Sequence, residues 1–209
     1  MQTLIGKSSE FAPGLEGAIA AYRYKIFIER LGWQLPVEHG MERDQFDHAE
    51  TLYVVARGPQ GDICGCARLL PTTAPYLLSE VFAHLMGDQA VPRTADVWEL
   101  SRFAAASLAQ SSSAEAAANT RRLLAAAVQA AWINGAKRLI TVSPMGIERL
   151  LQRMGVNSRR AGPPSLADGK RIFGCWIEID EQTLRALGIV ARKPAHPRPR
   201  PEPARCVAA

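Results

Sequence analysis

The sequence predicts an α/β fold of the layered α+β kind, with helices packed on a mostly antiparallel central sheet. Three observations lead to this class. Segments with apolar residues at helical spacing alternate with short β-rich runs. Two of those runs flank the turn sequence GPQGD, which is typical of a hairpin. The chain of 209 residues is long enough for one well-buried core, so we expect a single domain over residues 1–190.

Helical spacing of apolar residues over 14–31 predicts the first helix, and Gly32 supplies a stop signal at its end. The runs TLYVVA (51–56) and DICGCARLL (62–70) predict the two strands of the hairpin. Residues 76–87 then predict a short helix before the next strand.

The second half continues the alternation of strand and helix. The run VWELSRFAA (97–105) predicts a strand, and Ser113 predicts the N-cap of an alanine-rich helix over 114–134. Three further elements complete the order: a strand KRLITVS (137–143), a helix PMGIERLLQRMG (144–155) and a strand near 171–180.

The composition, 47% hydrophobic and 22% charged, is that of a globular protein, and no apolar run approaches the roughly 20 residues of a membrane span. The first residues lack a basic region followed by an apolar one, so we expect no signal peptide and a cytoplasmic location. The net charge of +5 lies mostly in the proline-rich segment 191–209, which carries +4. We expect this tail to be disordered, since alternating proline and charge cannot form a core.

The four cysteines are Cys64, Cys66, Cys175 and Cys206. Cys64 and Cys66 point to opposite faces of a predicted strand, and no second cysteine pair or nearby histidine completes a tetrahedral set. We therefore expect free thiols and no metal site. A catalytic cysteine has little support, because no histidine partner is evident.

The predicted strand VWELSRFAA carries a charge on each face, because alternation sends Glu99 to one side and Arg102 to the other. Burying an unpaired carboxylate or guanidinium is costly, so both charges need partners or a purpose. Both side chains reach one site only if a bulge or splayed strand breaks the alternation, or if the site wraps the strand edge. Otherwise one of the two supports the site from behind.

Three sets of residues resist a purely structural explanation: Arg23, Phe27 and Trp33; Asp44, Phe46 and Asp47; and Arg68, Glu99 and Arg102. Each set taken alone has an ordinary structural explanation. Arg23 would lie on an exposed helix face and the aromatic residues in the core, the two aspartates would be turn or capping residues, and the third set would form a structural salt bridge. Together, three arginines and three acids could neutralise one another as a charge network in a cleft.

Four sequence blocks carry these residues: YRYKIFIERLGW (22–33), ERDQFD (42–47), CGCARLLPT (64–72) and VWELSRF (97–103). In this order they resemble the signature of the acyl-homoserine-lactone synthases, the LuxI-type autoinducer synthases. That pattern asks for Arg, Phe and Trp in the first block and two aspartates three apart in the second. It asks for one Arg in the third block, and for Glu with Arg three later in the fourth, and the sequence meets every requirement.

The resemblance implies a fold similar to that of the GNAT N-acetyltransferases and a defined reaction. Enzymes of this family transfer an acyl group from an acyl carrier protein to the amine of S-adenosylmethionine, and lactonisation then expels methylthioadenosine to give a quorum-sensing signal. S-adenosylmethionine is a substrate, so no cofactor is expected. The expected partners are the carrier protein and this small molecule, with no nucleic acid, no membrane and no obligate protein partner.

The resemblance also assigns roles to the residues that match the pattern. S-adenosylmethionine carries cationic groups, a carboxylate and an adenine, so acids, arginines and aromatic rings suit its pocket. The amine must lose a proton before attack, and Glu99 is the expected general base, with a pKa held low by nearby arginines. Arg68 would order the acidic cluster. The expected catalytic residues are Glu99, Arg68, Arg102 and Asp47; the expected S-adenosylmethionine-binding residues are Arg23, Phe27, Trp33, Asp44, Asp47, Arg102 and Phe103.

The expected acyl donor is a carrier protein, because AAASLAQSSSAEA (104–116) lacks the glycines that cradle a coenzyme A pyrophosphate in many relatives of this fold. Carrier proteins present an acidic helix, so basic docking residues are expected. Our candidates for docking are Lys137, Arg138, Arg149 and Arg153; those for the acyl-chain pocket are Thr141, Ser143 and Met145. In the family a hydroxyl in this region favours a 3-oxo chain, and Ser143 occupies about that position.

Two other functions remain open at this point. An acetyl-coenzyme A-dependent N-acetyltransferase would share the fold, although the missing glycine loop and the four blocks oppose it. The positive charge would suit a nucleic-acid-binding module, although it is concentrated in the tail. Removal of residues 191–209 distinguishes a nucleic-acid-binding module from a synthase, since the binding module would lose its partner and the synthase would keep its turnover.

Overall fold

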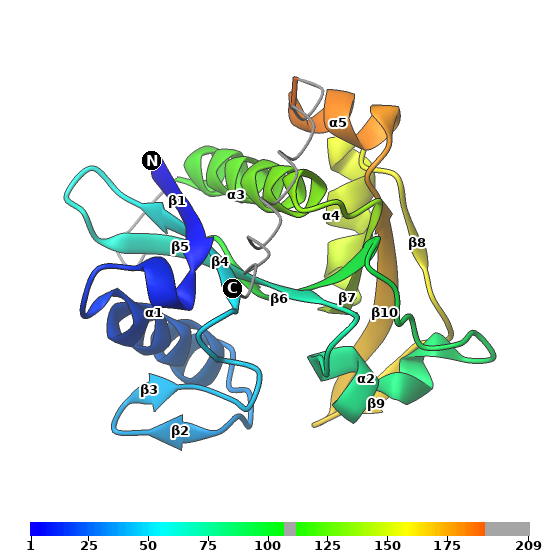
Figure 1. Ribbon diagram of the computed structural model, residues 1–209, viewed down its shortest axis with the longest axis horizontal. Helices are drawn as coiled ribbons and strands as arrows, with labels where there is room; N and C mark the ends of the chain where they lie inside the picture. Colours follow the sequence, from blue (N-terminus) through cyan, green and yellow to red (C-terminus); the bar gives the residue numbers. More distant parts are fainter. Residues whose placement is uncertain (107–111, 191–209) are drawn as a thin grey trace, which may run out of the picture.

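The computed structural model describes residues 1–106 and 112–190 (Figure 1). The predicted tail and residues 107–111 of the glycine-free segment lie outside this part of the chain. The strands are β1 (Gln2–Lys7), β2 (Val37–Glu38), β3 (Met41–Glu42), β4 (Leu52–Arg57), β5 (Ile63–Pro71), β6 (Val97–Ala104), β7 (Arg138–Pro144), β8 (Ser158–Arg160), β9 (Ser165–Ala167) and β10 (Lys170–Glu178).

The helices are α1 (Leu15–Arg23), α2 (Leu77–Val81), α3 (Ser113–Ile133), α4 (Gly146–Met154) and α5 (Glu181–Leu187). Shorter or wider turns are the 3₁₀ helices η1 (Ser8–Glu10) and η3 (Ala83–Met86), and the π-helix η2 (Tyr24–Arg30) that continues α1. No helix in the described part of the chain is both long and apolar enough to cross a membrane.

One large sheet runs in the order β1-β4-β5-β6-β7-β10-β8, with β9 paired to β10, while β2 and β3 form a separate hairpin. All neighbours in the large sheet are antiparallel except β6 and β7, which are parallel. Helices cover both faces of the sheet (Figure 1). This architecture confirms the predicted layered class with a mostly antiparallel sheet.

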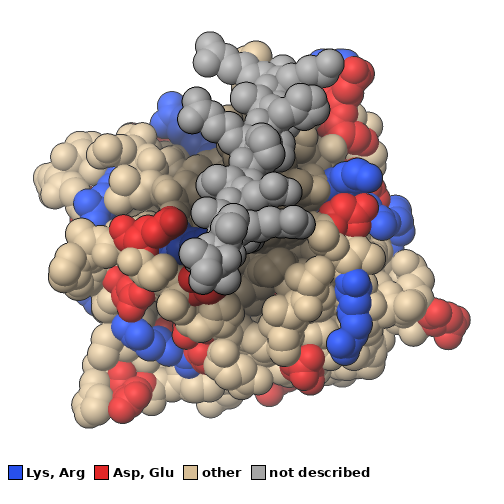
Figure 2. Space-filling view, viewed as in Figure 1, with Lys and Arg blue, Asp and Glu red and all other residues tan. Residues whose placement is uncertain are grey.

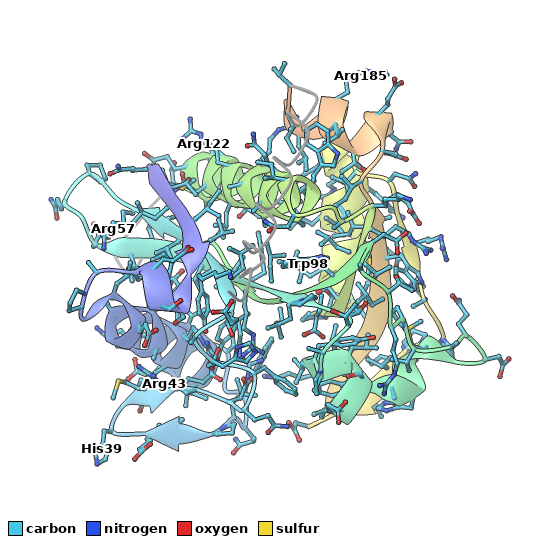
Figure 3. All side chains as sticks on the ribbon, viewed as in Figure 1. His39, Arg43, Arg57, Trp98, Arg122 and Arg185 are labelled. Atoms are coloured by element: carbon cyan, nitrogen blue, oxygen red, sulfur yellow. The ribbon has the colours of Figure 1, made fainter. Side chains whose placement is uncertain are left out.

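Alternation along the strands divides the core between the two faces of the sheet. Val54 on β4 and Leu69 on β5 pack with α3, α4 and α5 on one face. Tyr53 and Val55 pack with α1 on the opposite face, where α2 also lies, over Leu70 on β5 and Trp176 on β10. Figure 3 shows Trp98 pointing from β6 to the α3 side. The sheet therefore separates an α1/α2 side from an α3/α4 side.

A β-bulge interrupts β6 next to Arg102. Arg68 on β5 pairs with Ser101, whereas Cys66, two residues earlier, pairs with Ala104, three residues later, so β6 contains one extra residue. Arg102 takes up this residue with a left-handed φ of 50°. The bulge turns Arg102 to the same side of the sheet as Glu99. A bulge is one of the conditions under which the sequence allowed both side chains to reach one site.

The parallel strands β6 and β7 separate soon after they meet. They pair from Val97 with Arg138 to Glu99 with Ile140, yet β6 continues to Ala104 and β7 to Pro144. The backbone edges of their C-terminal halves therefore face a gap in the middle of the sheet. This gap leaves room for a cavity in the middle of the sheet.

Several details differ from the sequence predictions. Ser112, not Ser113, is the N-cap of α3, because its backbone is extended and its hydroxyl accepts from the amide of Glu115. The first helix widens to π geometry after Arg23. α4 begins at Gly146, because residues up to Pro144 still belong to β7. Seven short elements have no counterpart among the sequence predictions: β1, η1, β2, β3, β8, β9 and α5.

Candidate active site

Six buried charges form a closed ring on the α1/α2 side of β5 and β6. Arg23 binds Glu42 at 2.6 Å and Asp47 at 2.7 Å. Arg102 binds Glu42 at 2.9 Å and Asp44 at 2.8 Å. Arg68 closes the ring, at 2.5 Å from Asp44 and 2.8 Å from Asp47. We call these residues the charge ring; in it each guanidinium touches two carboxylates and each carboxylate touches two guanidiniums.

The pairing keeps the ring ionised despite its burial. Arg23 and Arg68 are at most 1% exposed. Burial alone would raise the pKa of Asp47, but hydrogen bonding to Arg23 and the charges of Arg23 and Arg68 hold that pKa well below its usual range. The same Asp47 accepts a hydrogen bond from the Tyr53 hydroxyl, whose pKa is raised by burial and by the carboxylate charge.

The predicted network of three arginines and three acids exists, but its third acid is Glu42 instead of Glu99. Glu42 has no solvent exposure and accepts from both Arg23 and Arg102. It lies two residues before Asp44 in the same block, ERDQFD, so only its spacing could have drawn attention to it. Asp44 and Asp47 also serve the local turn, since Asp44 accepts from the amide of Phe46 and Asp47 from that of Asp44.

Glu99 stands apart from the charge ring, beneath α2. Its oxygens accept from the amides of Leu78 at 2.7 Å and Leu77 at 3.1 Å, which are free donors at the start of the helix. Burial raises the pKa of Glu99, opposed by these amides, by Arg68 and by a hydrogen bond from Ser101. The prediction of a low pKa was wrong, because the desolvation of a fully buried carboxylate outweighs the nearby positive charge.

A cavity of about 200 Å³ passes through the sheet at the gap between β6 and β7. The α1/α2 side contributes Phe27, Trp33, Leu77, Phe82, Ser101 and Arg102. The α3/α4 side contributes Thr141 and Ser143 on β7, whose cross-strand partners Cys175 and Phe173 belong to the core on that side, together with Phe103, Thr120, Leu124, Ile147, Leu150 and Met154. Figure 2 shows the molecular surface hollowed between the two halves of the sheet. One end of the cavity is therefore aromatic and cationic, and the other is apolar.

The predicted S-adenosylmethionine-binding residues fall into two groups. Phe27, Trp33 and Arg102 line the α1/α2 end of the cavity, whereas Phe103 lies at its α3/α4 end. The rings of Phe27 and Trp33 stack with centroids 5.1 Å apart, and the Arg102 guanidinium lies 5.9 Å from the Phe27 centroid. The second group, Arg23, Asp44 and Asp47, belongs to the charge ring, as does Arg68, and does not line the cavity.

Two of the three predicted acyl-pocket residues line the cavity. The hydroxyls of Thr141 and Ser143 lie 3.3 Å apart, both buried and both on β7. Met145 follows the end of β7 and packs against the apolar core instead of lining the cavity.

The four predicted docking residues lie in two places. Arg149 and Arg153 are exposed on α4, whose apolar residues line the cavity. Lys137 and Arg138 lie at the start of β7, the end remote from the gap: Lys137 is near Asp96 at 3.8 Å, and Arg138 stacks on Trp176 at 4.9 Å. No cluster of three or more side chains suited to a metal ion occurs within residues 1–106 and 112–190.

Comparison with known proteins relates this site to one enzyme family. The sequence model of the family described as autoinducer synthase matches residues 15–187. An acyl-homoserine-lactone synthase from Ralstonia solanacearum is 48% identical over 192 residues, which cover 90% of this chain and 94% of that protein. The family model, matched over residues 15–187, therefore spans every residue of the charge ring and of the cavity.

Solved structures of similar proteins share the fold. TofI, crystallised with an inhibitor and MTA, has a TM-score of 0.81 and 49% identity over 91% of this chain and 98% of that one. BjaI, a CoA-dependent acyl-homoserine lactone synthase solved with SAM and isopentyl-CoA, has a TM-score of 0.77 and 25% identity over 88% and 85%. An acyl-CoA N-acyltransferase from Pseudomonas aeruginosa, 15% identical with a TM-score of 0.59 over 84% and 99%, shares the fold alone.

Proposed function

Since the chain belongs to the autoinducer synthase family, the acyltransferases known as acyl-homoserine-lactone synthases, we propose that it acylates the α-amine of S-adenosylmethionine from the thioester of an acyl carrier protein. The carrier thiol leaves as the amide forms. The carboxylate oxygen of this amide product then attacks the γ-carbon of its methionine part, which breaks the bond from that carbon to the sulfonium sulfur, closes the lactone and releases methylthioadenosine. The observation that carries this proposal is the cavity with two chemically different ends that meet at the gap between β6 and β7.

The α1/α2 end of the cavity suits S-adenosylmethionine. The stacked rings of Phe27 and Trp33 offer aromatic faces for an adenine or a sulfonium, and Arg102 offers a guanidinium for the carboxylate. Because the rest of the charge ring does not line the cavity, its members hold Arg102 in place instead of meeting the substrate. Two similar structures, TofI with MTA and BjaI with SAM, support this choice of ligand.

The amine is protonated near neutral pH and must lose a proton before it attacks the thioester. Ser101 lines the cavity and donates to Glu99, while Arg68 donates to the Ser101 oxygen at 3.0 Å. We assign to Glu99 the role of proton acceptor through Ser101 or a water molecule. Its raised pKa makes it a stronger base than an exposed carboxylate, which suits this role.

The α3/α4 end of the cavity suits an acyl chain. Leu124 on α3 and Ile147, Leu150 and Met154 on α4 provide an apolar wall. The open backbone edges of β6 and β7 offer hydrogen-bonding groups to an extended amide-bearing arm such as that of a carrier protein. Thr141 and Ser143 place two hydroxyls beside the chain, which favours a 3-oxo substituent.

A carrier protein and coenzyme A are the two candidate donors of the acyl group. Exposed Arg149 and Arg153, four residues apart on α4, support docking of an acidic partner beside the acyl end. The similar protein BjaI is described as CoA-dependent, so coenzyme A is the second candidate donor.

The test is product analysis with the purified chain, S-adenosylmethionine and matched acyl-carrier-protein and acyl-coenzyme A thioesters. We expect acyl-homoserine lactone and methylthioadenosine in equal amounts by mass spectrometry, with the carrier-protein donor preferred. Glu99→Ala and Arg68→Ala, checked for folding by circular dichroism, should lose the product. Preference for coenzyme A would overturn the choice of donor, and absence of lactone with every donor would refute the proposed reaction.

A further inference from the structure

The hairpin of β9 and β10 reaches from the C-terminal half of the chain to the mouth of the cavity. Its turn consists of Asp168 and Gly169, with φ of 49° and 72°, between the paired residues Ala167 and Lys170. Two consecutive left-handed residues in a two-residue loop give a type I′ turn, for which Asp-Gly is a preferred sequence. Ala167, Asp168 and Lys170 all line the cavity, so the hairpin is a well-defined arm at its edge.

Lys170 joins this arm to the N-terminal half of the molecule. Its ammonium donates to the carbonyl oxygen of Leu31, 139 residues earlier in the chain. Leu31 directly follows the last residue of η2, at the helix end that carries the partial negative charge of the helix dipole. The lysine therefore neutralises a helix end as well as bridging the mouth. In Figure 1 the β9–β10 hairpin lies on the α2 side of the molecule, opposite the β2–β3 hairpin.

The same ammonium lies 5.9 Å from the centroid of the Trp33 ring. Trp33 stacks on Phe27, and Phe27 in turn lies next to Arg102. Lys170 thus begins a continuous chain of contacts that runs along the cavity wall to the charge ring. Every member of this chain lines the cavity, and Lys170 is the member that comes from the opposite half of the protein.

We propose that Lys170 is a positioning residue for the S-adenosylmethionine end of the cavity. It fixes the indole of Trp33 against Phe27 and ties the β9–β10 arm to the end of η2, so that the aromatic surface is formed before the substrate arrives. Asp168, on the same turn, places a carboxylate at the mouth. Its negative charge offsets the repulsion between the Lys170 ammonium and a cationic substrate. This inference rests on the proposed function, because S-adenosylmethionine is taken as the ligand.

The test compares Lys170→Met, which keeps the aliphatic stem, with Lys170→Arg, which keeps the charge. Lys25→Met is the matched control, since Lys25 is exposed on η2 and does not line the cavity. Binding of S-adenosylmethionine is measured by calorimetry, and KM for each substrate is measured in the turnover assay. A cation–π contact at an exposed site favours the arrangement of its two groups by about twofold to fivefold in an equilibrium constant, so the less ordered indole in Lys170→Met should weaken S-adenosylmethionine binding about twofold to fivefold. KM for the acyl donor should not change, Lys170→Arg should restore binding, and Lys25→Met should match the wild type.

Two results would overturn the inference: unchanged S-adenosylmethionine affinity in Lys170→Met, or a raised KM for the acyl donor alone, which would make Lys170 a donor contact. The binding measurement separates this outcome from failure of the proposed reaction. If the wild type binds S-adenosylmethionine but yields no lactone, the reaction fails while the role of Lys170 is still decided by the affinities. If the wild type does not bind S-adenosylmethionine, both proposals fall.

Discussion

Replacing Glu42 with glutamine should destabilise the protein severely, although the side-chain shape is kept. Glu42 has no solvent exposure and accepts hydrogen bonds from Arg23 at 2.6 Å and from Arg102 at 2.9 and 3.1 Å. The substitution changes the net charge of the ring from zero to +1 and turns one acceptor into an amide donor. Removal of one partner from a buried ion pair costs about 3–5 kcal/mol, and because glutamine still accepts one bond we expect about 3 kcal/mol.

The loss is measurable by thermal and urea unfolding followed by circular dichroism. For a chain of this size, about 3 kcal/mol corresponds to a fall in Tm of roughly 6–12 °C. The control is Glu38→Gln on the neighbouring strand of the same hairpin, where the side chain is 86% exposed and the expected change is within about 0.5 kcal/mol. A loss below about 1 kcal/mol in Glu42→Gln would contradict the closed ring.

A double variant separates charge balance from simple packing. Removing Arg102 as well, in Glu42→Gln with Arg102→Met, leaves Arg23 and Arg68 opposite Asp44 and Asp47, so the buried charge is balanced again. The double variant should therefore be less destabilised than the sum of the two single variants, by at least about 1 kcal/mol. Additive losses would show that Glu42 and Arg102 are not coupled through the ring.

Three further predictions concern activity and pH. Because burial raises the pKa of Glu99, kcat/KM should fall as the pH is lowered from neutral through that raised value, and Glu99→Gln should be at least about 100-fold slower and lose this limb. A profile unchanged in shape would exclude Glu99 as the titrating base. The lowered pKa of Asp47 contributes stability that is present above its ordinary value near pH 4 and lost as the pH falls through the lowered value. Urea unfolding should therefore find Asp47→Asn less stable than the wild type at pH 7, with a smaller difference at pH 3; an equal difference at both would contradict the shift. Reversing Arg149 and Arg153 to glutamate should raise KM for an acyl carrier protein at least about tenfold at low salt without changing KM for S-adenosylmethionine, and equal effects on both would argue against docking on α4.

The order of the main strands and helices was predictable because it depends on local periodicity. The hairpin of β4 and β5 and the long helix α3 follow from alternation, turn residues and apolar spacing that few other structures satisfy. The Asp168-Gly169 turn was also readable in the sequence, and attention to that signal would have found the β9–β10 hairpin. The short strands β2 and β8 carry too few residues for a periodic pattern.

The site was predictable in its residue types but not in its connections. Arg23, Arg68 and Arg102 were identified, yet the partner common to Arg23 and Arg102 was not, because Glu42 has the appearance of an ordinary surface glutamate in a polar loop. The bulge was recognised as one condition for Glu99 and Arg102 to share a side, but nothing local selects it. The left-handed backbone of Arg102 becomes favourable only when Glu42 and Asp44 are present to receive the side chain.

The position of Arg102 gives a reason for the charge ring to exist. A buried set of ion pairs is rarely the most stable way to fill a core, since apolar side chains of the same volume often serve as well or better. A non-glycine residue in the left-handed region adds strain of about 1–3 kcal/mol. Arg102 has this strained backbone and takes part in two of the buried ion pairs, and it alone among the six ring members lines the cavity. The other five charges therefore act together to hold one guanidinium, at a strained point of β6, where the aromatic end of the cavity meets the gap in the sheet.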